Sequence, residues 1–74
     1  MAKTDWVKIA ARIREIREKS SLNQTEFGKH LGGLPQTLVS KYERGTIRPP
    51  LDFLVGAADL GKVSLDWLVR GKKS

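Results

Sequence analysis

The 74-residue sequence contains no cysteine, which excludes disulfides, thiolate chemistry and zinc sites built from cysteine. His30 is the only histidine, so we expect neither a metal site nor a cofactor. No apolar run approaches the roughly 20 residues of a membrane span. The first residues, MAKTDWVK, lack the apolar stretch of a secretory signal. These absences predict no membrane partner and a cytoplasmic protein.

Acidic residues are few compared with basic ones: 8 Asp and Glu stand against 14 Lys and Arg, for a net charge of +6. This excess favours a polyanionic partner. Arg70, Lys72 and Lys73 supply half of it, so charge alone does not identify the partner. The length and mixed composition predict one domain over residues 1–74, in which residues 70–74 form a flexible basic tail.

Groupings of catalytic residues are also missing. The carboxylates are not paired beside a nucleophile, and no serine has a plausible histidine–acid partner. No glycine-rich phosphate loop follows a strand pattern. We therefore expect a protein that is not an enzyme.

Apolar spacing predicts an all-α fold of five short helices. We expect them at residues 6–19, 24–31, 35–44, 51–60 and 65–69, with no strand. In the first, an inward stripe comprises Trp6, Ile9, Ala10, Ile13 and Ile16. In the fourth, the inward residues are predicted to be Leu51, Leu54, Val55 and Ala58.

Capping residues support these boundaries. Thr4 or Asp5 can begin the first helix, and Asn23 with Glu26 forms a capping-box pattern before the second. Gly32 and Gly33 end the second helix, Pro35 begins the third at its first helical position, and Gly45 ends it. Ser64 can cap the last helix, which Gly71 ends.

The most informative stretch is residues 24–45, QTEFGKHLGGLPQTLVSKYERG. Its two helical segments flank a glycine turn and can turn one apolar set toward a core, namely Phe27, Leu31, Leu34, Val39 and Tyr42. The second segment then presents Gln36, Thr37, Ser40 and Lys41 outward. Such side chains can hydrogen-bond base edges or phosphates, so the stretch predicts a helix-turn-helix that enters a DNA major groove.

Residues 12–68 carry the pattern R-x(4)-LNQ-xx-F-G-xx-LG, then LPQTLVSKYERG, a proline after the next loop, and VSLDWL. This order resembles the lambda-repressor-like, Cro/cI-type (XRE) helix-turn-helix family. The resemblance implies a compact five-helix bundle. It also implies a sequence-specific regulator that binds double-stranded DNA, of the phage or bacterial repressor type, and occupies a two-fold symmetric operator as a homodimer. Two features depart from the family pattern: the turn holds one extra glycine, and Pro35 replaces a frequent Ser or Thr cap.

The resemblance also implies roles for individual residues. Gln24 would brace the DNA backbone and orient a side chain of the recognition helix, and Gln36, Thr37 and Lys41 would be the main base readers. Arg17 and Glu43 would form a structural ion pair. The full predicted DNA-binding set is Asn23, Gln24, Gln36, Thr37, Ser40, Lys41, Arg44, Thr46 and Arg48.

The last predicted helix is unusually apolar for its length. Its large apolar residues cannot all face inward, so we expect a dimer interface comprising Leu65, Trp67 and Val69. In a different interpretation, Trp67 folds back onto Trp6 or Phe53. The exposed apolar end also keeps a second function open, a protein-interaction module such as an antitoxin. A third is non-specific binding of acidic lipid or RNA by the basic tail.

Overall fold

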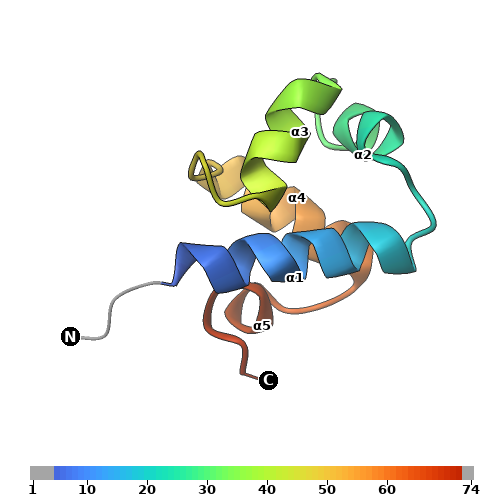
Figure 1. Ribbon diagram of the computed structural model, residues 1–74. Helices are drawn as coiled ribbons and strands as arrows, with labels where there is room; N and C mark the ends of the chain where they lie inside the picture. The colour runs from blue at the N-terminus through green and yellow to red at the C-terminus, as the bar shows by residue number, and fades with distance from the viewer. Residues whose placement is uncertain (1–4, 73–74) are drawn as a thin grey trace.

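The computed structural model describes residues 5–72 and contains five helices in this range (Figure 1). They are α1 (Trp6–Lys19), α2 (Gln24–His30), α3 (Gln36–Glu43), α4 (Leu51–Gly61) and α5 (Leu65–Arg70). The predicted all-α, five-helix fold is confirmed. Thr4, the alternative first cap, and Lys73 of the predicted tail lie outside the described residues.

Three helices begin at side-chain caps. Asp5 Oδ1 accepts hydrogen bonds from the backbone N–H groups of Val7 and Lys8, both at 3.2 Å. At α2, Asn23 Oδ1 accepts from Glu26 N at 2.8 Å while Glu26 Oε1 accepts from Asn23 N at 2.9 Å, which completes the predicted capping box. Ser64 caps α5. Local sequence therefore fixes where these helices start.

Several helix boundaries differ slightly from the prediction. α2 ends at His30, one residue early, and α3 ends at Glu43 rather than at residue 44. Pro35 lies just before α3 as its cap residue, not at the first helical position, because its backbone remains extended with ψ at 152°. α4 and α5 each run one residue further than predicted, so Arg70 belongs to α5 and not to the tail.

The core draws on all five helices. In Figure 1, α1 passes between α3 on one side and α5 on the other, and α4 lies behind it. Phe27 is fully buried, and its ring meets that of Phe53 edge-on at a centroid distance of 6.0 Å. The ring of Tyr42 also packs against that of Phe53, at a centroid distance of 4.7 Å. This aromatic group joins α2, α3 and α4.

The predicted inward face of α4 was wrong at two positions. Leu51 and Val55 are 64% and 41% exposed, whereas Phe53 and Ala57 are buried beside Leu54 and Ala58. Both possible stripes follow helical spacing. The observed rotation is the one that buries the large Phe53 ring, which removes more apolar area from water than Leu51 would.

None of the helices in residues 5–72 combines the length and hydropathy needed to cross a bilayer. Over the same residues, no three histidine, aspartate or glutamate side chains gather as metal ligands.

Candidate nucleic-acid interface

The turn between α2 and α3 is folded back onto the end of α2. The carbonyl oxygen of Gly28 accepts hydrogen bonds from the backbone N–H groups of Gly33 at 3.0 Å and Leu34 at 2.9 Å. Gly32 and Gly33 have φ angles of 102° and 78°, which L side chains rarely adopt. The longer turn thus depends on both glycines and brings the chain directly into α3.

α3 has one buried side and one exposed side. Val39 and Tyr42 point into the core, and Leu38 is partly buried against it. Gln36, Thr37 and Lys41 are exposed and Ser40 is partly exposed. The predicted base-reading residues therefore lie on the accessible side of the helix, and Leu38 folds over the core.

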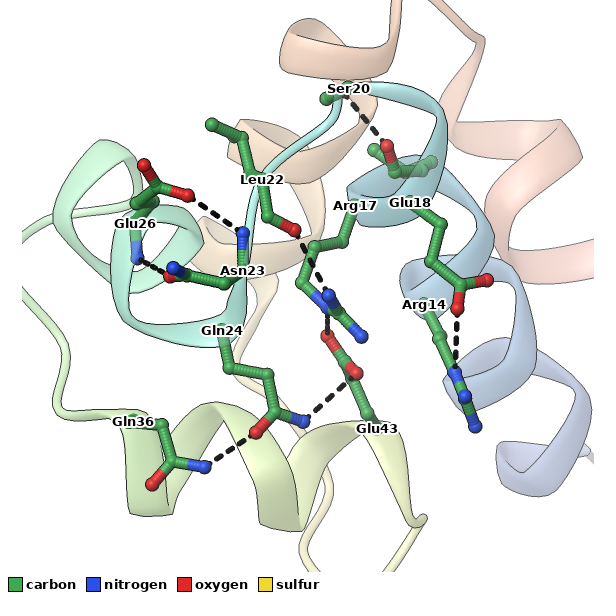
Figure 2. Close-up of polar contacts among 11 residues, drawn as sticks. Arg14, Arg17, Glu18, Ser20, Leu22, Asn23, Gln24, Glu26, Gln36 and Glu43 are labelled. Atoms are coloured by element: carbon green, nitrogen blue, oxygen red, sulfur yellow. Dashed lines mark hydrogen bonds and ion pairs between the residues drawn. The ribbon is translucent and has the colours of Figure 1, made fainter.

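Arg17 of α1 and Glu43 at the end of α3 form an ion pair (Figure 2). Arg17 Nε lies 2.7 Å from Glu43 Oε2, and Arg17 Nη1 donates to the carbonyl oxygen of Leu22 at 3.0 Å. The side chains of Glu43 and Arg17 are only 3% and 14% exposed. The pair therefore ties α1 to the C-terminal end of α3 inside the protein, as predicted from the family resemblance.

Gln24 links the two ends of α3 (Figure 2). Its Nε2 group donates to Glu43 Oε1 at 3.2 Å, and its Oε1 atom accepts from Gln36 Nε2 at 2.6 Å. Gln24 is therefore hydrogen-bonded to Gln36, one of the predicted base-reading residues. The neighbouring Asn23 uses Oδ1 to cap α2, which leaves its amide nitrogen as the group that could donate to a phosphate.

The loop after α3 carries the remaining predicted contacts. Arg44, Thr46 and Arg48 are all exposed. The guanidinium carbon of Arg48 lies 5.4 Å from the ring centroid of Trp6, a cation–π distance. Sequence reasoning missed this role of Trp6, because nothing in the local pattern of either residue indicates a contact across 42 positions.

The predicted dimer residues belong to α5, which lies across α1 from α3 (Figure 1). Leu65 is 36% exposed, and Trp67 and Val69 are partly buried against the core. Leu68, from the same helix, is fully buried. Trp67 also lines a groove of about 630 Å³ together with Ile16, Leu60 and Val63 among others.

Comparison with known proteins places this geometry in a family. The helix-turn-helix family profile matches residues 13–68. The P22 c2 repressor, solved with a synthetic operator, is 28% identical with a TM-score of 0.77, over 86% of this chain and 96% of that one. The restriction-modification controller protein C.AhdI of Aeromonas hydrophila is 30% identical with a TM-score of 0.73, over the same shares.

PlcR of Bacillus thuringiensis, solved with the peptide PapR7 and DNA, is 26% identical with a TM-score of 0.72. That match covers 84% of this chain and 21% of PlcR. No curated protein sequence matches the chain. Since the family profile spans well over half of the residues, this chain belongs to the lambda-repressor-like, Cro/cI-type (XRE) helix-turn-helix family, as its sequence pattern predicted.

Proposed function

We propose that this protein is a sequence-specific, double-stranded DNA-binding transcriptional regulator that inserts α3 into the major groove. The observation that carries the proposal is the two-sided character of α3, whose inner residues are buried while Gln36, Thr37 and Lys41 stand exposed. A groove about 12 Å wide admits such a helix. The operator complex of the P22 c2 repressor and the DNA complex of PlcR support the same use of the fold.

Each exposed group on α3 suits a particular base edge. A glutamine amide such as that of Gln36 can pair with N6 and N7 of adenine, and an ammonium such as that of Lys41 can donate to O6 and N7 of guanine. The methyl group of Thr37 can contact the methyl group of thymine. Ser40 lies at the edge of this face, where its hydroxyl would reach a base or a phosphate.

Contacts to the DNA backbone would flank α3. Asn23 and Gln24 lie at the start of α2, and the exposed Arg44, Thr46 and Arg48 follow α3. Such contacts fix the orientation of the protein without reading sequence. The net charge of +6 supports a polyanionic partner.

We propose further that the protein acts in the cytoplasm as a homodimer through Leu65, Trp67 and Val69, and represses by occupying a promoter. Two α3 helices would then lie in successive major grooves roughly 10 bp apart. The alternative, a protein-interaction module such as an antitoxin, is favoured by the exposed apolar side chains of Leu51 and Val55 on α4. Co-purification of one stoichiometric protein partner, with no selective DNA binding, would favour that alternative.

The function is tested by selecting bound sites from randomised duplexes. We expect a two-fold symmetric consensus with half-sites about one helical turn apart. Lys41→Ala should change the selected consensus at one base pair in each half-site. Lys19→Ala provides a control of equal charge, because Lys19 lines the groove beside Trp67 and not the face of α3. Equal affinity for all duplexes would overturn the proposal.

A further inference from the structure

Three side chains connect a buried charge to the exposed face of α3. Glu43 is at the inner end, Gln24 in the middle and Gln36 at the outer end (Figure 2). Glu43 and Gln36 are seven residues apart, two turns along α3, so a single side chain from α2 can reach both. We call this chain of contacts the Gln36–Gln24–Glu43 relay.

The chemistry of the relay permits one orientation of each amide. An ionised carboxylate only accepts hydrogen bonds, so Gln24 must turn its NH2 group toward Glu43. The carbonyl oxygen of Gln24 then faces Gln36, which must donate a hydrogen bond to it from its own NH2 group. The distances of 3.2 Å and 2.6 Å fit both bonds. A reversed Gln24 would place its oxygen against the carboxylate, which also only accepts, and the bond to Glu43 would be lost.

Glu43 itself cannot turn away from this arrangement. Its side chain is 3% exposed, and its second oxygen is held by Arg17 at 2.7 Å. Arg17 is held in turn by the carbonyl oxygen of Leu22. Arginine has no acceptor, so Arg17 can only donate to Glu43. The donor-to-acceptor direction of every hydrogen bond in the relay is therefore set from Arg17.

We propose that Glu43 sets the hydrogen-bond polarity of Gln36 and thereby the base that Gln36 prefers. The inference rests on the proposed function and deepens it, because it assigns specificity to a residue that cannot touch DNA. Glu43 is a positioning residue, since it acts through Gln24.

The polarity has a definite consequence for base reading. With one N–H committed to Gln24, Gln36 keeps its carbonyl oxygen and its second N–H for a ligand. One acceptor and one donor match N6–H and N7 of adenine. If the relay ran the other way, one lone pair of the Gln36 oxygen would accept from Gln24, and both N–H groups of Gln36 would be free for the base. Two donors match the two acceptors of guanine, N7 and O6.

Glu43→Gln is the variant that reverses the relay. Arg17 can still only donate, so the glutamine at position 43 must turn its carbonyl oxygen toward Arg17. Its NH2 group then faces Gln24. Gln24 then turns over, and so does Gln36. We expect the preferred base at the Gln36 position to change from adenine toward guanine, while the other positions of the site stay the same.

The experiment first defines the site of the wild-type protein from randomised duplexes and locates the Gln36 base pair with Gln36→Ala. Affinities are then measured for duplexes that differ only there. A bidentate contact discriminates between bases by roughly 5- to 150-fold. We expect the adenine-to-guanine affinity ratio to fall at least tenfold in Glu43→Gln, on the order of that range. A ratio cancels any general loss of affinity.

Glu26→Gln is the matched control. It makes the same change of residue and charge on α2, where a glutamine can still complete the capping box, and it should leave the ratio unchanged. Gln24→Leu should lower the ratio because it frees Gln36 to turn either way. In the Gln24→Leu background, Glu43→Gln should have no further effect on the ratio.

The outcomes separate the two proposals. A wild-type protein that selects no sequence overturns the proposed function and the relay with it. A selective wild type whose ratio is the same in folded Glu43→Gln overturns the relay alone. If Glu43→Gln does not fold, the test is made with Gln24→Leu. An adenine-to-guanine affinity ratio that is unchanged in Gln24→Leu also overturns the relay.

Discussion

Gly28 is the position in the helix-turn-helix where adding a single methyl group should destabilise the fold most. A Cβ atom built there overlaps the backbone carbonyl oxygen of Leu34 and lies 3.2 Å from Val39 Cγ2. The obstacle is backbone, and the carbonyl oxygen of Gly28 itself holds the turn through the N–H groups of Gly33 and Leu34. No side-chain rotation can relieve the overlap, so Gly28→Ala must push α2 away from the turn.

The expected loss follows from two opposing terms. Overpacking of a close-packed site costs about 1–3 kcal/mol or more. Alanine in a helix interior regains up to ~1 kcal/mol over glycine. We therefore expect Gly28→Ala to lower the free energy of unfolding by about 1–2 kcal/mol. For a domain of this size, each kcal/mol lowers Tm by about 4–8 °C, which predicts a fall of roughly 5–15 °C.

Gly56→Ala is the matched control in the same fold. Its Cβ atom would meet only Leu31 Cδ2, at 3.1 Å, the end of a flexible and partly exposed side chain. The gain in helix propensity is the same at both positions, so the difference between the two melting curves isolates the backbone overlap. Thermal melts followed by circular dichroism measure it. If the Tm of Gly28→Ala is equal to or higher than the Tm of Gly56→Ala, this account of the turn is refuted.

Four further changes test other parts of the molecule. Lys41→Ala should weaken specific binding by roughly 1–3 kcal/mol and relax selectivity at one base pair, whereas equal loss on random DNA would contradict base reading. Arg48→Ala should weaken all duplexes alike and reduce the salt slope by about one, and an unchanged slope would remove it from the phosphate contacts. Trp67→Ala should shift the protein toward monomer at micromolar concentration, and an unchanged sedimentation profile would contradict the dimer. Arg17→Ala should cost about 3–5 kcal/mol of stability by stranding Glu43, and strictly additive losses in the Arg17→Ala, Glu43→Ala double mutant would dismiss the pairing.

The predictions that agreed with the structure rest on local chemistry. The cap at Asp5, the capping box of Asn23 with Glu26, and the cap at Ser64 need only a few neighbouring residues, so the sequence sets where these helices start. The inward stripe predicted for α1 is confirmed at Ile9, Ala10, Ile13 and Ile16, which are buried, whereas Trp6 is only partly buried against the core. The family pattern placed the helix-turn-helix within one or two residues.

The features that could not be predicted depend on distant residues. Two stripes on α4 fit helical spacing equally well, and only the position of the Phe27 and Tyr42 rings decides that Phe53 turns inward. Arg48 meets Trp6 only after α1 and the loop following α3 come together. The link from Gln24 to Glu43 likewise needs the angle between α2 and α3, which no local pattern encodes.

The way α3 is held explains why a buried ion pair lies in so small a domain. An eight-residue helix is not stable alone, and α3 places only Val39 and Tyr42 fully in the core. A buried pair such as Arg17 and Glu43 adds little net stability over apolar residues of the same shape, because both charges lose water. An apolar pair, however, would tolerate small rotations of α3. Directional bonds at its C-terminal end, extended by Gln24 to Gln36 at its N-terminal end, fix the rotation of the helix about its own axis, and that rotation decides which side chains can reach a base.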